Sequence, residues 1–302
     1  LMVLSGCIND EKTQETIPDN YTIGVVRTIG NKNSTDILYF DENLKQTGIT
    51  HYNYATMGEL FYSPIVYDGF LYIVPQGQAN KKDEKTILQL DLDTLVQQEY
   101  PLDQIAIYGL SVNSSAIYAA NNINGKSFIS RIDRADKTVE TAIYDDLYIS
   151  IVYFYQDRLY AFSSQSTSSG IKGALHCLDP ITLEEVERID ISEFGSDVYS
   201  VTGVGNILYF APSVNSQDTF NQVVYAYNIS TEEISAIKFP EDVFHIVNMD
   251  DKLYVTHGNL VTGEGTTLSV YTTDIGEINT YDLNMWPGQI TIKDNALYVM
   301  GA

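Results

Sequence analysis

The residues best suited to chemistry form a triplet that recurs along the chain: an acid, an aliphatic residue and an aromatic residue. Carboxylates beside aromatic faces suit a sugar, a cationic group or a metal ion. A structural alternative stays open, in which the aromatic residue packs between repeats and the acid caps a turn. The triplets and their partial copies give these candidate binding residues: Glu59, Tyr62, Tyr108, Asp146, Tyr148, Asp197, Tyr199, Asp242, Phe244 and Trp286.

Motifs for catalysis are not found in the sequence. The four histidines have no metal-ligand spacing, and the chain has no Gly-rich phosphate loop, nucleophile elbow, HExxH helix or EF-hand loop. Asn121 to Gly125 is only faintly similar to a calcium loop, and a Gly turn is the favoured interpretation. We therefore predict no catalytic residue and no cofactor, with calcium kept as an alternative ligand of the acids.

A short strand with a Leu-Tyr or Ile-Tyr pair organises the rest of the chain. It recurs with tyrosines at positions 72, 118, 160, 209, 254 and 298, which are 46, 42, 49, 45 and 44 residues apart. Strand-like repeats with a period near 45 residues are typical of a β-propeller, in which no single small sheet can bury its own faces. The two residues of each pair should point to opposite faces of the strand and fill the gaps between neighbouring blades.

Three further strands accompany the Leu-Tyr strand, which we term B. Strand A precedes it across a short turn, strand C follows and mostly ends in Asp or Asn, and the polar strand D would form the outer edge. The Asp or Asn is expected to accept hydrogen bonds from turn amides. Five such repeats fit between about Phe61 and Leu283.

The two ends of the chain contribute the remaining strands. Residues 21–49 have B-like, C and D strands, and the end of the chain offers A and B. If these strands close one blade together, the fold is an all-β propeller of six four-stranded antiparallel blades. One B-like strand is then surplus. A ring of seven blades, the last of them incomplete in this sequence, is therefore the alternative interpretation.

One face of the ring is expected to carry function. The A–B and C–D turns are short and share one face, whereas the B–C connections and the starts of strand A share the other. Long polar loops on one face of a rigid scaffold commonly bind partners. The expected B–C loops are Pro75 to Lys85, Asn121 to Ser127, Ser163 to Gly173, Ala211 to Gln222 and Thr256 to Thr267.

The first residues are interpreted separately from the fold. Residues 1–7 are an apolar run that ends in Cys7 and are interpreted as the remnant of an export signal peptide, and Leu4-Ser5-Gly6-Cys7 resembles the lipobox of bacterial lipoproteins. The resemblance implies that Cys7 carries the lipid and anchors an exported protein in the cell envelope. Residues 8–20 are predicted to be a flexible tether and residues 21–302 a single propeller domain. The second cysteine, Cys177, has the pattern of a buried strand residue.

Charge limits the partners. The chain has 40 acidic and 17 basic side chains and a formal net charge of −23. Such a field repels phosphate backbones and anionic lipid headgroups, so nucleic acid is excluded as a partner and membrane contact is expected only through the lipid anchor. A protein or a carbohydrate at the envelope surface is the expected partner.

The repeat also resembles a known group of proteins. Tyr254-Val255-Thr256-His257-Gly258-Asn259, followed by Leu268-Ser269-Val270-Tyr271, is similar to YVTN-type surface propellers, and quinoprotein-like and lactonase-like propellers share much of the pattern. The resemblance implies a secreted or surface-anchored propeller and transfers no catalytic residue. The leading hypothesis is a binding scaffold that uses its long-loop face. The alternative is a lactonase, lyase or quinoprotein-like enzyme with carboxylates at the channel mouth.

Overall fold

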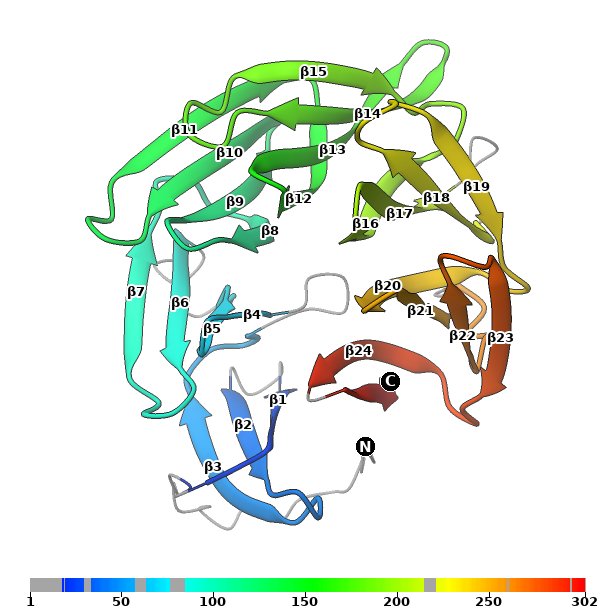
Figure 1. Cartoon of the computed structure of the whole chain (residues 1–302). Coiled ribbons are helices and arrows are strands. Elements are labelled where there is room, and N and C mark those ends of the chain that lie inside the picture. The colour runs from blue at the N-terminus through cyan, green and yellow to red at the C-terminus, as the bar shows by residue number, and fades with distance from the viewer. Residues whose placement is uncertain are drawn as a thin grey trace.

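The computed structural model describes residues 18, 20–29, 34–57, 64–76, 85–214, 221–259, 261–293 and 295–301. Their strands form antiparallel sheets arranged around a central axis (Figure 1). Strand A of each sheet lies innermost and strand D outermost. The fold is the six-bladed β-propeller that the repeat predicts.

Five blades are complete four-stranded sheets in chain order. Their strands are β4 (Ile65–Tyr67), β5 (Phe70–Ile73), β6 (Thr86–Asp91) and β7 (Gln97–Pro101); β8 (Ile107–Val112), β9 (Ala116–Ile123), β10 (Lys126–Asp133) and β11 (Val139–Asp145); β12 (Tyr148–Tyr155), β13 (Arg158–Thr167), β14 (Gly170–Leu178) and β15 (Glu185–Asp190); β16 (Ser196–Val204), β17 (Ile207–Val214), β18 (Val223–Asn228) and β19 (Ile234–Lys238); β20 (Val243–Met249), β21 (Lys252–His257), β22 (Thr267–Thr272) and β23 (Glu277–Asp282).

The ends of the chain supply two smaller sheets. β1 (Ile23–Ile29), β2 (Ser34–Phe40) and β3 (Gln46–Tyr52) form one, and β24 (Pro287–Lys293) pairs with β25 (Ala296–Gly301) in the other. In the described residues no strand pairing joins them, so the predicted closure of the two ends into one continuous sheet is not found. The Nζ of Lys293 instead donates a hydrogen bond to the Thr22 carbonyl at 2.9 Å.

The Leu-Tyr strand has the predicted role between blades. Leu159 and Tyr160 are adjacent on β13, yet they belong to different core clusters. Leu159 packs with Tyr118 of the preceding blade, whereas Tyr160 packs with Leu208 of the following blade. The same alternation unites Tyr72 with Ile117 and Tyr209 with Leu253. Each of these four gaps therefore receives one tyrosine and one aliphatic side chain.

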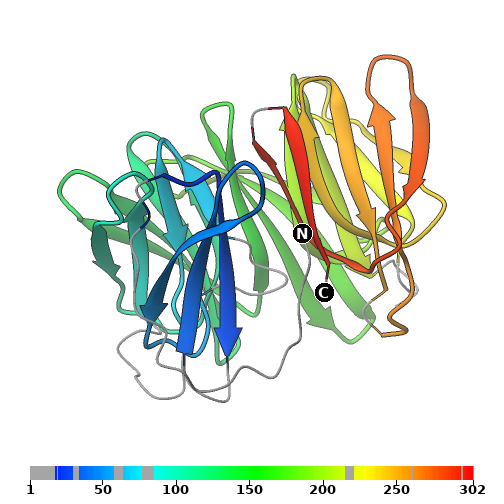
Figure 2. The ribbon, with the colours of Figure 1, turned by 90° about the horizontal axis from the view of Figure 1, so that it is seen from below.

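The C–D turns confirm the predicted side-chain chemistry. The Oδ1 of Asp179 accepts hydrogen bonds from the amides of Ile181 and Thr182, both at 2.8 Å. Asp41, Asp91, Asp133 and Asn228 make equivalent contacts. In four blades the fourth residue after this Asp or Asn has a positive φ without being glycine: Leu95, Lys137, Leu183 and Glu232. The β2–β3 and β22–β23 turns extend to the same side of the ring (Figure 2).

Two of the predicted long B–C loops are wrong. β9 and β10 continue to a two-residue turn at Asn124-Gly125, where both φ values are positive, at 53° and 76°. β13 and β14 likewise pair out to Thr167 and Gly170. The polar residues that suggested loops belong to strands, because the regular pairing of these hairpins satisfies their backbone groups. The loops after β5 and β17 lie largely outside the described residues, and the loop after β21 is the long connection that the sequence predicts.

Candidate functional site

The acid of the triplet stands where the backbone turns into strand A. Asp146 and Asp197 have φ values of 60° and 56°, and the same conformation occurs at Ala106 and Asn284 in the partial copies. Asp and Asn adopt this left-handed conformation more readily than most residues because their short polar side chains can bond locally. Turn geometry thus explains an acid or amide at this position in three of the repeats.

In three of the repeats the aliphatic residue, rather than the aromatic one that follows it, fills the space between blades. Ile107, Val198 and Val243 are buried, with exposed fractions of 1%, 1% and 8%. The structural alternative expected the aromatic residue to pack between the repeats. The aromatic side chains that follow these aliphatic residues are only half-buried.

A β-bulge redirects three of the aromatic residues. The pairing of strands A and B skips Tyr108, Tyr199 and Phe244, so each is the extra residue in its strand. In β12 and β24 the bulge lies two residues after Tyr148 and Trp286. Bulges bend a strand locally and re-aim a side chain, and they are frequent beside binding sites. The sequence carries no pairing information from which the bulges could be predicted.

The aromatic residues of neighbouring blades meet. Burial, together with the nearby Tyr148 and Asp197, raises the pKa of Tyr199, so its hydroxyl stays protonated. Farther round the ring, Phe244 and Trp286 have ring centroids 4.9 Å apart. Gly258 permits this packing, because a Cβ at that position would lie 3.0 Å from the Trp286 ring. Five repeats thus contribute aromatic residues to one side of the ring.

The carboxylates of Asp197 and Asp242 have different hydrogen-bond partners. Asp197 accepts a hydrogen bond from Ser164 Oγ at 2.8 Å, and Asp242 accepts one from Asn259 Nδ2 at 2.8 Å. Asp146 is exposed and lines a depression that Ser164, the partner of Asp197, also lines. Among the residues that the structure describes, no three His, Cys, Asp or Glu side chains lie together as a metal site would need. The enzymatic alternative requires Glu59, Asp146, Asp197 and Asp242 to converge, and Glu59 lies outside the described residues.

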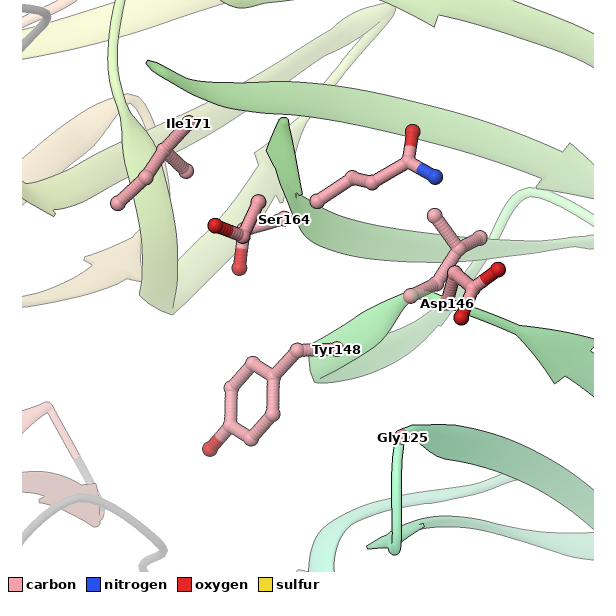
Figure 3. Close-up of a pocket in the computed structure, with 8 residues that line it drawn as sticks. Gly125, Asp146, Tyr148, Ser164 and Ile171 are labelled. Atoms are coloured by element: carbon pink, nitrogen blue, oxygen red, sulfur yellow. The ribbon is translucent and has the colours of Figure 1, made fainter. Parts of the chain in front are cut away.

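A polar depression lies beside Tyr148. It has a volume of about 490 Å³ and is lined by Asp146, Tyr148 and Ser164, with Gly125 and Ile171 on opposite sides (Figure 3). Because Ser164 also bonds Asp197, two triplets of adjacent blades are linked at this place. The depression combines an aromatic ring, a carboxylate and hydrogen-bonding side chains, and the described residues that line it include no Lys, Arg or His.

The central channel is a second cavity with a different chemistry. It has a volume of about 270 Å³, and Tyr108 and Tyr199 lie among its lining residues. Its walls are mostly aliphatic side chains of the A strands, and the described residues that line it include no Asp, Glu, Lys or Arg.

Two buried histidines form polar networks that the sequence did not indicate. His176 bonds Ser163 Oγ through Nε2 at 2.7 Å and Glu185 through Nδ1, an order that resembles a Ser-His-acid triad. Ser163 and His176 are only 4% and 2% exposed, so this pair is enclosed within its blade. His257 similarly bonds Ser269 Oγ at 2.7 Å. Burial lowers the pKa of both histidines, which stay neutral.

Several predicted features are not tested by the structure. Glu59, Tyr62 and Cys7 lie outside the described residues. Cys177 is a free, buried thiol, as predicted. In the described part of the chain, no helix has the length and apolar character that crossing a membrane requires.

The geometry defines a β-propeller with aromatic residues at one mouth of its channel. No protein-family model matches the chain, and no curated protein matches it. Similar solved structures include BamB from Moraxella catarrhalis, with 11% identity, a TM-score of 0.53, and coverage of 89% of this chain and 76% of that chain. Hsv2 from Kluyveromyces lactis has 11% identity, a TM-score of 0.48, and coverage of 71% and 60%. At this identity the likeness to BamB shows the fold alone.

Proposed function

We propose that this protein is an extracytoplasmic binding scaffold, held at the membrane through Cys7, that presents its aromatic mouth to a protein partner. The mouth is the surface formed by Tyr108, Tyr148, Tyr199, Phe244 and Trp286. The observation that carries the proposal is their common position at the start of successive A strands. Three of them, Tyr108, Tyr199 and Phe244, are the extra residues of β-bulges. Their side chains therefore point in a direction that they would not have in a regularly paired strand.

The chemistry of the mouth favours a protein. Tyr and Trp are enriched at the centres of protein interfaces, because they bury much area and lose little side-chain entropy. The net charge of −23 favours a partner with basic groups, since opposite charges speed the encounter. The rigid sheet behind each aromatic residue further reduces the ordering cost of binding.

Site-directed photo-crosslinking in cells tests this role. A photo-reactive phenylalanine analogue replaces Tyr148 at the mouth or, as a matched control, Tyr281, which is 55% exposed on the outer strand β23. Position 148 should give a discrete protein adduct that position 281 does not give. Equal adducts from both positions, or an adduct from position 281 alone, would refute the assignment of this face. Retention on a glycan array without a protein adduct would point to a carbohydrate partner instead.

The anchor is a separate element of the proposal. The resemblance of Leu4-Ser5-Gly6-Cys7 to a lipobox supports it. Mass spectrometry of protein expressed with its complete signal should find acylated Cys7 in the membrane fraction, and Cys7→Ser should release the protein from that fraction. An unmodified Cys7 in membrane-associated protein would contradict the anchor and leave the role of the mouth untouched.

A further inference from the structure

The central channel differs from the rest of this acidic protein in that the described residues of its wall include no carboxylate. Each of the six A strands contributes one aliphatic side chain to it: Ile65, Leu110, Ile151, Val201, Val247 and Ile290. The described residues of the wall include no Asp, Glu, Lys or Arg, and His245 is the one histidine among them. A cation in this space would lose its hydration without a lining carboxylate to pair with, and an anion would meet no Lys or Arg, so the binding of either ion is strongly unfavourable.

Polar groups in the wall join neighbouring blades. Ser200 Oγ accepts a hydrogen bond from the Ile246 amide at 2.8 Å, and Gln76 Nε2 donates to the Ile107 carbonyl at 3.3 Å. These bonds connect β16 to β20 and the end of the β5 segment to β8. The wall is consequently fixed by contacts between blades, and its aliphatic surface faces a preformed space.

We infer that this channel is a binding site for a small, uncharged, largely apolar molecule, such as one that carries a single aromatic or alicyclic ring. The cavity volume of about 270 Å³ lies just below the roughly 300–1,000 Å³ range of sites for drug-sized ligands. A ring in the channel would remove aliphatic surface from water, and preformed apolar cavities bind such molecules readily. This inference is independent of the protein partner, because it rests on the wall of the channel and not on the exposed surface of the mouth.

Three probes of the same shape and different charge test the inference: toluene, benzylammonium and benzoate. Ligand-observed NMR saturation transfer measures their affinities for the full chain. Toluene should bind saturably, and both ions should bind at least about tenfold more weakly, equivalent to about 1.4 kcal/mol. Tighter binding of benzylammonium would show that carboxylates at the rim, and not the apolar wall, select the ligand, and would overturn the inference.

Filling the channel shows where toluene binds. Ile151 and Leu110 line the channel and are only partly buried, so Ile151→Phe or Leu110→Phe should occupy part of it and weaken toluene binding by at least about tenfold. Val186→Phe is the control, because Val186 is 66% exposed on the outer strand β15. Two filling variants are used in case one fails to fold, which circular dichroism would reveal. Toluene that does not bind, or that binds equally to folded filling variants, refutes the site.

Trp286 gives a second readout that needs no label. It is the only tryptophan, its ring packs on Phe244, and the Phe244 ring lies 4.4 Å from that of His245, which lines the channel. Toluene in the channel should change the fluorescence of Trp286 with the same dissociation constant that NMR gives. A fluorescence change with a different constant, or one that persists in the filling variants, would place toluene outside the channel and contradict the inference.

Discussion

Tyr118 and Tyr160 stand at equivalent positions of neighbouring repeats but differ in their hydrogen bonding. Each is 1% exposed and packs between blades. The Tyr118 hydroxyl donates to the Pro180 carbonyl at 3.0 Å and accepts from Asn113 Nδ2 at 3.3 Å. The Tyr160 hydroxyl is buried without a hydrogen-bond partner among the described residues, and burial raises its pKa to about 12. Replacement by phenylalanine should therefore have opposite effects at the two positions.

The magnitudes follow from the hydrogen bonds. Tyr118→Phe removes a bond whose net contribution is about 0.5–1.5 kcal/mol, and it also leaves the Pro180 carbonyl without this donor. Tyr160→Phe removes a buried hydroxyl that has no partner, so the variant should be as stable as the wild type or more stable by up to about 1 kcal/mol. Because the ring stays in place, neither substitution opens a cavity.

Urea denaturation followed by circular dichroism measures both variants in the same buffer. The expected difference between them in unfolding free energy is about 0.5–2.5 kcal/mol. Equal losses in the two variants would refute the reasoning, because the Tyr160 hydroxyl would then be hydrogen-bonded in the folded protein. A larger loss of unfolding free energy in Tyr160→Phe than in Tyr118→Phe would show that the Tyr160 hydroxyl makes the stronger hydrogen bond, and would also contradict the reasoning.

Three further perturbations test the packing, the buried histidines and the turns. Leu208→Ala should destabilise the fold by about 2–5 kcal/mol, because Leu208 is 0% exposed between blades, and an unchanged denaturation midpoint would contradict that packing. The melting temperature should fall as the pH decreases below about 6.5, because His176 and His257 bind protons more readily in the unfolded chain than in the folded protein. In the folded protein His176 lies near Glu185, Arg188 and Tyr144, and His257 lies near Glu241 and Asp242. The range from pH 7.5 to 5.5 lies roughly above the carboxylate pKa values. Over this range the melting temperature should depend less on pH in the double variant His176→Gln/His257→Gln. An equally steep profile in the double variant would assign the pH dependence to other groups. Glu232→Gly should stabilise by about 0.5–1 kcal/mol, because Glu232 has a φ of 61°, whereas Ser230→Gly in the same turn should destabilise; equal effects would remove the conformational explanation.

The sequence predicts those parts of the fold that local chemistry determines. The period of the Leu-Tyr strand, the four strands of each repeat and the Asp or Asn turns can all be read within one repeat. Asp179 and its turn amides are separated by only two and three residues, for example. The alternation of Leu159 and Tyr160 between two gaps also follows, because neighbouring strand residues point to opposite faces.

Features that depend on contacts between distant segments are not predicted. Asn121 and Ser163 are polar enough to resemble loop residues, but pairing with β10 and β14 keeps them within strands. The bond between Ser164 and Asp197 joins two blades and has no signal in either repeat. Tyr199 can be singled out from its triplet, but the bulge that redirects it depends on its pairing with β17. The sequence thus predicts which aromatic residues belong to the site, but not the directions in which their side chains point.

The affinity of the mouth for its crosslinked protein partner is the most direct measure of the proposed function. With the adduct identified and the partner purified, calorimetry compares Tyr148→Ala with Tyr281→Ala, two truncations of tyrosine at the mouth and on the outer strand. Tyr148→Ala should weaken binding by at least about tenfold, the loss of about 1.4 kcal/mol or more expected of an interface centre, while its melting temperature stays close to that of Tyr281→Ala. Unchanged affinity in Tyr148→Ala, together with reduced affinity in Tyr281→Ala, would contradict the account and move the interface to the outer strands.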